Sequence, residues 1–280
     1  MNFIRKPEWL RTKIYSESSF SGVSAVIKEH GLHTICSSGR CPNQSECWSK
    51  GTATLMIGGE ICTRSCKFCN TLSGRPLPLD PNEPANVAKS IHLMQLKHAV
   101  VTSVDRDDLA DGGAQHWAQT ISEIKKQNPL TTLEVLIPDF EGKEELIDLI
   151  INEKPNIISH NLETVRRLTP QIRTKAKYDT SLKVLAYIAS RGIVAKTGIM
   201  LGLGETDEEV LQLMDDALST GCSVLTIGQY MQPSRKNIAV TAYIHPDKFE
   251  EFRQIALQKG FRQVESGPFV RSSYHAEKHV

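Results

Sequence analysis

The feature that most restricts the fold of this 280-residue chain is a regular alternation of short apolar runs with amphipathic segments. Runs of strand length lie at 52–57, 98–103, 133–137, 156–160, 194–201 and 223–227. Helical periodicity is found at 114–126, 143–151, 180–190 and 207–218, and again near 247–259. Repeated strand–helix units predict an α/β fold with a parallel sheet and right-handed crossovers. Periodicity does not decide between an open sheet and a partial barrel, but in both architectures ligands collect at the carboxyl ends of the strands.

Composition narrows the classes of activity. The chain is 40% hydrophobic and 23% charged, and its formal net charge of +1 counts against bulk binding to nucleic acid or to a membrane surface. No apolar run reaches the ~18–20 residues of a membrane span, and the amino-terminal residues lack the apolar core of a secretory signal. We therefore expect a cytoplasmic protein, in a reducing compartment where clustered cysteines indicate metal binding or catalysis more often than disulfides.

Six of the seven cysteines form two triplets that lie close together in the sequence. The triplets are Cys36, Cys41 and Cys47, spaced Cys-x4-Cys-x5-Cys, and then Cys62, Cys66 and Cys69, spaced Cys-x3-Cys-x2-Cys. A closed structural zinc site uses four ligands, so each triplet is one ligand short. Each site therefore either leaves a metal open to a small molecule or recruits a fourth ligand from a distant part of the chain.

Two kinds of metal centre remain open for these triplets. Zinc with His30 or His33 as a fourth ligand is one alternative, but zinc motifs usually pair their cysteines twice over, and no second pair follows downstream. Iron–sulfur clusters are held by cysteine thiolates, and a four-iron cluster on three cysteines keeps one iron free for a chelating ligand. For the upstream triplet, the other alternative is a purely structural metal site that stabilises the polar amino-terminal segment.

The downstream triplet carries the first resemblance to a known group of proteins. Phe68 precedes its last cysteine, and the whole motif follows the first predicted strand. In these respects the chain resembles the radical S-adenosylmethionine superfamily, whose members bind S-adenosylmethionine on the open iron and cleave it to a 5′-deoxyadenosyl radical. The resemblance implies a 4Fe–4S cluster on Cys62, Cys66 and Cys69, and a partial parallel (β/α)6 barrel with amino- and carboxyl-terminal extensions.

A narrower resemblance comes from the two triplets taken together with Arg271-Ser272-Ser273-Tyr274. This combination, with the stretches 101–109, 160–165, 196–205 and 228–234, is similar to the lipoyl synthase family over nearly the whole chain. It implies that Cys36, Cys41 and Cys47 hold an auxiliary 4Fe–4S cluster with Ser273 as its fourth ligand. A serine oxygen is a harder donor than a thiolate and matches iron–sulfide surroundings poorly, which suits a cluster that is dismantled as the sulfur source.

The same resemblance implies a domain organisation and an activity. It divides the chain into an extension at 1–50, a radical S-adenosylmethionine partial barrel at 51–232 and a second extension at 233–280. The implied activity is insertion of two sulfur atoms, at C6 and C8, into an octanoyl chain on a lysine of a lipoyl carrier domain or of glycine cleavage H protein. A ferredoxin- or flavodoxin-type reductant and an iron–sulfur carrier that rebuilds the auxiliary cluster are further implied partners, without nucleic acid or membrane.

Two other functions are weighed against this one. A biotin synthase-like sulfur-inserting enzyme is the nearest in chemistry, but that group lacks the upstream triplet and the serine motif. A non-enzymatic zinc module is the alternative from a different class, and the near-neutral charge and the six strand–helix units count against it.

Three polar residues are candidate contacts of S-adenosylmethionine. Asn161 and Glu163 follow the fourth predicted strand, a region that often contacts this cofactor in the superfamily; helix capping or surface polarity is their alternative role. Arg173 lies in a basic stretch, for which a solvated charged face is the ordinary interpretation. Its alternative roles are contact with the cofactor carboxylate or with an acidic carrier protein.

Overall fold

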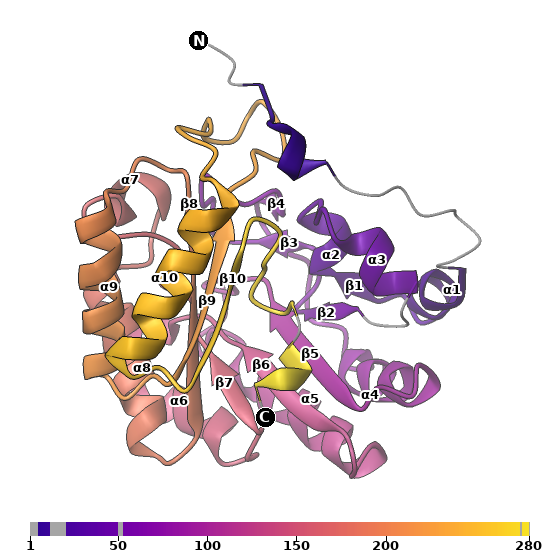
Figure 1. The fold of residues 1–280 in the computed structure, drawn as a ribbon. Helices are drawn as coiled ribbons and strands as arrows, with labels where there is room; N and C mark the ends of the chain where they lie inside the picture. Colours follow the sequence, from indigo (N-terminus) through magenta and orange to yellow (C-terminus); the bar gives the residue numbers. More distant parts are fainter. Residues whose placement is uncertain (1–4, 12–20, 50–52, 275, 280) are drawn as a thin grey trace.

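A curved eight-stranded sheet forms the centre of the computed structural model, which describes residues 5–11, 21–49, 53–274 and 276–279. Its strand order is β1-β2-β5-β6-β7-β8-β9-β10, parallel from β2 to β10, with β1 antiparallel at one edge. The strands are β1 (His33–Thr34), β2 (Thr54–Ile57), β5 (His98–Ser103), β6 (Thr132–Leu136), β7 (Ile157–Ser159), β8 (Val194–Leu201), β9 (Val224–Gln229) and β10 (Gln263–Gly267). Among the described residues β1 and β10 are not paired with each other, so the sheet is an open, partial barrel (Figure 1).

The helices that connect the strands cover the outer face of the sheet (Figure 1). They are α4 (Glu83–Leu93), α5 (Ala114–Gln127), α6 (Glu144–Ile151), α8 (Tyr178–Ser190), α9 (Asp207–Ser219) and α10 (Pro246–Lys259), with the short α7 (Thr169–Ile172) before α8. Local sequence sets their ends. The start of α9 is a capping box between Thr206 and Glu209, and α10 begins with Pro246, which suits a first helical position. None of the described helices combines the length and apolar character needed to cross a bilayer.

Two hydrophobic cores support the fold. The large one fills the space between the sheet and its outer helices, and includes fully buried residues of the central strands such as Val101, Val135 and Leu225. The small one belongs to the amino-terminal extension, where α1 (Ser21–Glu29), α2 (Ile35–Ser38) and α3 (Gln44–Ser49) gather Val23, Cys36, Trp48 and Ala53. The upstream cysteines are therefore built on a core of their own beside the barrel.

The six predicted strands and the predicted helices are confirmed, although residue 52 of the first strand lies outside the described residues. The structure adds four strands that the sequence did not predict: β1, β10, and the pair β3 (Ile61–Cys62) and β4 (Leu72–Ser73) within the downstream cysteine loop. Three of them are two residues long, which is too short for any periodicity to register. Both extensions thus contribute an edge strand to the central sheet.

The carboxyl-terminal segment, residues 269–274 and 276–279, contacts both the amino-terminal extension and the barrel. A Cβ atom on Gly228 of β9 would lie 2.2 Å from the Val270 carbonyl oxygen, so the segment passes this strand at a distance that only glycine permits. The Asn43 side chain donates a hydrogen bond of 2.7 Å to the Phe269 carbonyl. Further along, Nδ1 of His279 lies 3.0 Å from the buried Nζ of Lys196. The segment between these anchors includes Ser273.

Candidate functional site

A cavity of about 350 Å³ lies at the carboxyl ends of the barrel strands, the edge at which ligands collect in parallel α/β folds. Both cysteine groups and the serine of the tail contribute to its wall, through Cys36, Cys41, Cys62, Cys66, Cys69 and Ser273. Much of the remaining wall is apolar, with Val104, Leu136, Ile137, Ile199, Met200 and Tyr230. One chamber therefore faces both groups, and its lining suits an alkyl chain better than a charged molecule.

The upstream cysteines are positioned by two short helices. Thr34 caps α2 by accepting a hydrogen bond of 3.2 Å from the Ser37 backbone, and this places Cys36 in the small core. The Cys41 backbone donates 3.0 Å to the Cys36 carbonyl, which brings the second cysteine next to the first. Cys47 lies in α3 and packs against the same small core without lining the cavity.

The tail serine lies beside this upstream group. The Thr54 hydroxyl, at the start of β2, donates a hydrogen bond of 2.8 Å to Oγ of Ser273. Thr54 also forms hydrogen bonds with the Cys36 sulfur; burial nevertheless raises the pKa of the Cys36 thiol above its ordinary value. Thr54 was not singled out in the sequence, and it is the residue that joins the two distant donors.

The downstream cysteines offer sulfur atoms in a setting that fits a cluster. The Cys62 sulfur accepts hydrogen bonds from the backbone N–H groups of Arg64 (3.4 Å) and Asp105 (3.3 Å). Burial raises the pKa of Cys62 to about 12 and that of Cys66 to about 11, so the thiols without a metal stay protonated at neutral pH. Iron would replace those protons, and N–H groups directed at the sulfur would then face a thiolate, as in iron–sulfur sites. In the part of the chain that the structure describes, no three His, Cys, Asp or Glu side chains converge as they would on a single metal ion.

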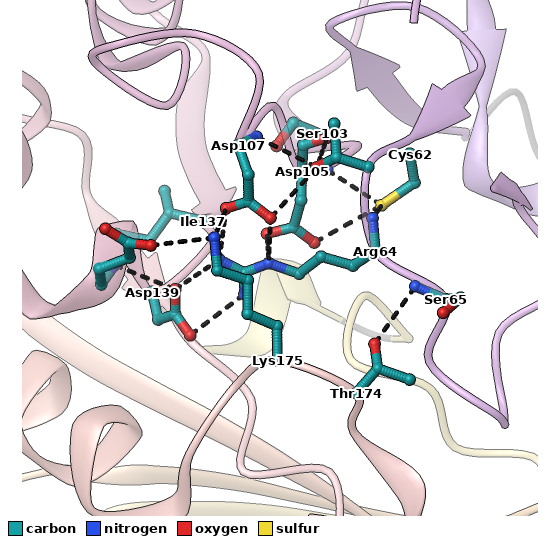
Figure 2. Close-up of polar contacts among 12 residues, drawn as sticks. Cys62, Arg64, Ser65, Ser103, Asp105, Asp107, Ile137, Asp139, Thr174 and Lys175 are labelled. Carbon is teal, nitrogen blue, oxygen red and sulfur yellow. Dashed lines mark hydrogen bonds and ion pairs between the residues drawn. The ribbon is translucent and has the colours of Figure 1, made fainter. Parts of the chain in front are cut away.

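Arg64, between the first two of these cysteines, fixes the loop to the barrel (Figure 2). Its side chain is only 5% exposed. The guanidinium donates two hydrogen bonds of 2.9 Å to Asp107, and two more, of 3.1 and 2.8 Å, to Asp139. Asp105 completes the group, with Oδ1 3.3 Å from Nε. Because Asp105 and Asp107 follow β5 and Asp139 follows β6, one cation holds the cysteine loop to the ends of two strands.

Charge states within this group follow from its contacts. Burial alone lowers the pKa of Arg64, but the hydrogen bonds to Asp107 and Asp139 outweigh it and raise the pKa above its ordinary value. Burial likewise opposes ionisation of Asp139, yet the hydrogen bonds from Arg64 lower its pKa to about 2. Lys175 extends the network, with Nζ 3.1 Å from Asp107 and 2.9 Å from Glu141. Arg64, Asp107 and Asp139 therefore remain ionised at neutral pH, whereas burial raises the pKa of Asp105.

All three candidate contacts of S-adenosylmethionine line the cavity. Nδ2 of Asn161 donates 3.2 Å to the Glu163 carboxylate, and burial raises the pKa of that carboxyl group. Backbone hydrogen bonds hold Glu163 against β8 at both its N–H and its carbonyl. Arg173 is 7% exposed, so the interpretation as part of a solvated face is wrong for this residue, whereas Arg166 and Arg167 nearby are half exposed and paired at the surface.

A chain of hydrogen bonds orients Arg173. Its Nη1 donates 2.9 Å to Oγ of Ser181, which lies 2.9 Å from Nε2 of His160. Nδ1 of His160 lies 3.0 Å from the Ile137 carbonyl oxygen, so Nδ1 carries the proton and Nε2 accepts from the serine. Burial, together with the Arg173 charge, lowers the pKa of His160 to about 4. The position of His160, directly before Asn161 at a strand end, was the only sequence signal for this role.

Comparison with known sequences agrees with this geometry. Residues 56–217 match the Radical SAM superfamily. A lipoyl synthase of Parabacteroides distasonis is 65% identical over 277 residues, which is 99% of each chain. That of Phocaeicola vulgatus is 64% identical over 280 residues, 100% of this chain and 99% of that one, and that of Treponema denticola is 60% identical over 276 residues, 99% and 95%.

Solved structures show a similar fold. Methylornithine synthase (PylB) superposes with a TM-score of 0.58 at 10% identity, covering 90% of this chain and 79% of that one. Streptococcus suis SuiB bound to precursor peptide SuiA gives 0.61 at 10% identity, covering 92% and 54%. At such low identity the likeness is one of fold alone, and it supports the partial barrel. The shared fold, the superfamily match and an identity of 60–65% over nearly the full length show that the chain belongs to the lipoyl synthase family of the radical S-adenosylmethionine superfamily.

Proposed function

We propose that this protein is a lipoyl synthase, an enzyme that inserts sulfur at C6 and C8 of an octanoyl chain amide-linked to a lysine of a carrier protein. The observation that carries the proposal is a largely apolar cavity whose wall includes residues of both cysteine groups and Ser273. A reaction at two unactivated carbons needs a radical source and a sulfur source on either side of the same alkyl chain. This cavity has candidate ligands for both.

The six clustered cysteines and Ser273 form two candidate cofactor sites. Cys62, Cys66 and Cys69 would hold the radical-generating 4Fe–4S cluster, and Cys36, Cys41, Cys47 and Ser273 the auxiliary one. When bound, the two clusters and S-adenosylmethionine supply a hydrogen-abstracting radical and the sulfur. The remaining tasks of orienting the substrate and excluding water belong to the side chains of the cavity.

Asn161, Glu163 and Arg173 would orient S-adenosylmethionine. A guanidinium suits the cofactor carboxylate because it presents paired donors, and Arg173 is held in place by Ser181. The Glu163 carboxylate, supported by Asn161, suits the cofactor ammonium. Arg173 is buried and Glu163 is half-buried, which favours such pairing, since a charge removed from water without a partner is costly.

Apolar side chains would position the octanoyl chain. Ile137 follows β6, Ile199 and Met200 belong to β8, and all three line the cavity. A carbon radical formed in an open site would be quenched, so a tight apolar wall protects the reaction as well as binding the substrate. The cavity mouth must then admit a lysine side chain from outside.

The proposal extends to partners, location and organisation. The substrate would be an octanoylated lipoyl carrier domain or glycine cleavage H protein, the electron donor a ferredoxin or flavodoxin, and an iron–sulfur carrier would rebuild the auxiliary cluster. We place the reaction in the cytoplasm. Residues 1–50 and 233–280 would serve as the extensions that carry auxiliary ligands, around the barrel of 51–232.

An anaerobic assay tests the proposal. Protein with reconstituted clusters is incubated with an octanoyl-lysine peptide, S-adenosylmethionine and dithionite, and mass spectrometry follows the peptide. Two added sulfur atoms are expected, with about eight irons per chain before turnover. Cys41→Ala should abolish the gain of sulfur, whereas the matched control Cys222→Ala should retain it, because Cys222 is buried away from the cavity. Formation of 5′-deoxyadenosine without any gain of sulfur would contradict the specific activity.

A further inference from the structure

Three segments meet at the mouth of the cavity, and we call them the rim: residues 38–42, 67–75 and 233–238. The backbone N–H of Ile238 donates 3.0 Å to the Lys67 carbonyl, which joins the third segment to the second. Nδ2 of Asn70 donates 2.9 Å to the Ser38 carbonyl, which joins the second to the first. Nη1 of Arg40 closes the ring at 3.2 Å from the Pro233 carbonyl.

Each rim segment also contributes to the cavity wall. Arg40 comes from the first segment, Thr71 from the second and Pro233 from the third. Because the same segments carry exposed residues, they extend from the cavity wall to the surface of the protein.

The rim carries charge of one sign only. It contains five basic residues and no aspartate or glutamate, and all five are exposed: Arg40, Lys67, Arg75, Arg235 and Lys236. The whole chain has 33 basic and 32 acidic residues, so this local excess departs sharply from the average. Some cations elsewhere on the described surface sit beside acids, as Arg167 does with Glu209 and Lys259 with Asp215. A cluster of cations in segments that contain no acidic residue creates a positive field at the rim.

The rim also presents an apolar side chain to solvent. Leu72 is 61% exposed and is one of a small number of large apolar residues that the described surface shows. Protein interfaces combine an apolar contact with surrounding polar and charged groups, whereas binding of nucleic acid depends mainly on charge. The composition of the rim, with the near-neutral net charge of the chain, favours a protein partner over a nucleic acid.

We infer that the rim is the docking surface for a carrier domain that is acidic around its octanoylated lysine. This inference rests on the proposed function, which requires a protein-bound acyl chain to reach the cavity. A lysine side chain with eight added carbons is short, so the carrier surface that surrounds the lysine must lie on the rim during the reaction. Complementary charge then orients the carrier and speeds its association.

The test reverses two charges of the rim that do not line the cavity. Arg235→Glu/Lys236→Glu is compared with Lys89→Glu/Lys183→Glu, which changes the net charge equally on the outer helices α4 and α8. Turnover is measured at low ionic strength with an octanoylated carrier domain and with a short octanoyl-lysine peptide that lacks acidic residues. The rim variant should raise KM for the carrier about tenfold, leave its kcat and the peptide turnover unchanged, and flatten the dependence of KM on salt. The control should match the unsubstituted protein.

Several results would overturn the inference. They are an unchanged KM for the carrier, an equal rise in the control variant, or a parallel fall in peptide turnover, which would place the two residues in the active site. Tight binding of a single-stranded oligonucleotide that is lost in the rim variant, with the carrier unaffected, would assign the rim to nucleic acid. Calorimetry of carrier binding to the cluster-free protein measures docking without catalysis. A lack of sulfur insertion would therefore contradict the proposed function, while the calorimetric comparison of the variants would still test docking on the rim.

Discussion

Arg64 and Asp139 form a two-point ion pair, with Nη1 3.1 Å from Oδ2 and Nη2 2.8 Å from Oδ1. The arginine belongs to the downstream cysteine loop and the aspartate to the segment after β6 (Figure 2). The pair therefore joins the cysteine loop, whose regular structure is limited to the short strands β3 and β4, to the rigid sheet. A site that must hold a metal cluster in one geometry needs such support from residues that do not touch the metal.

Arg64→Ala should destabilise the protein by about 3–5 kcal/mol, because it leaves three carboxylates, those of Asp105, Asp107 and Asp139, without their shared cation. Anaerobic denaturant unfolding of the cluster-free protein measures the change. The control is Arg253→Ala, which removes an exposed pair with Glu250 and should cost less than about 1 kcal/mol. An equal loss of unfolding free energy in the two variants would show that the buried Arg64 group stabilises the protein no more than an exposed ion pair does.

Gly228→Ala should empty the auxiliary site selectively. The added Cβ would lie 2.2 Å from the Val270 carbonyl oxygen, so the tail must move and Ser273 with it. Iron after reconstitution should fall from about eight to about four per chain, because the downstream cysteines do not depend on the tail. Gly267→Ala is the matched control, since Gly267 pairs with Gly228 and has room for a Cβ at 3.5 Å from its nearest neighbour. Retention of all iron by Gly228→Ala would argue against a role for the tail.

Ser273→Cys should keep or tighten the auxiliary cluster and impair sulfur donation, since a thiolate is a softer ligand for iron than a serine oxygen. The measurement is lipoyl product per polypeptide in a single round, with iron content determined beforehand. Full product formation at normal iron content would contradict the idea that the serine makes this corner detachable.

Protonation of His160 should make stability fall in mildly acidic solution. Burial lowers the pKa of His160 to about 4 from an ordinary value of 6.5. Between pH 4 and pH 6.5 this histidine is therefore protonated in the unfolded chain and neutral in the folded one. The free energy of unfolding is thus highest above pH 6.5 from this group and decreases as the pH falls towards 4, by about 3 kcal/mol. Urea unfolding across this range measures the slope.

His160→Gln should remove most of that slope, whereas His92→Gln, at an exposed position of α4, should leave it as it is. The effect is separable from that of Asp139, whose pKa of about 2 moves its own contribution to a more acidic range. A slope that persists in the His160 variant would assign the pH dependence to other groups.

For the buried ion pair of Lys196 and Glu134, we expect removal of one partner to destabilise the protein more than removal of both. Nζ lies 2.7 and 2.8 Å from the two carboxylate oxygens, and neither side chain is exposed. Burial lowers the pKa of Lys196, against the opposing charge of Glu134. Lys196→Met alone should cost about 3–5 kcal/mol, and Lys196→Met/Glu134→Leu should recover most of it. Denaturant unfolding of the three proteins gives the comparison; a double variant as unstable as the single one would contradict it.

The central strands were predictable because they are buried on both faces, so β5, β8 and β9 are mostly apolar without strict alternation, with the buried Lys196 of β8 as an exception. The edge strands β1 and β10 were not, since they are held by neighbours from distant parts of the chain and carry little pattern of their own.

The site shows the same division. Cysteine spacing alone indicated where cofactors are expected, because ligand spacing is local. The role of Arg64 depends on three acids that follow two different strands, and that of Thr54 on a serine near the end of the chain. A linear sequence names such residues but does not say that they meet.

The placement of Ser273 beside Thr54 has a consequence for biogenesis. The ligands proposed for the radical site, from residue 62 to residue 69, leave the ribosome together and early, while the other set waits for a residue at position 273. On a nascent chain the second pocket is incomplete until residue 273 has been synthesised. Vectorial synthesis thus favours an order of assembly in which the pocket of Cys62, Cys66 and Cys69 is complete before the one proposed for the auxiliary cluster.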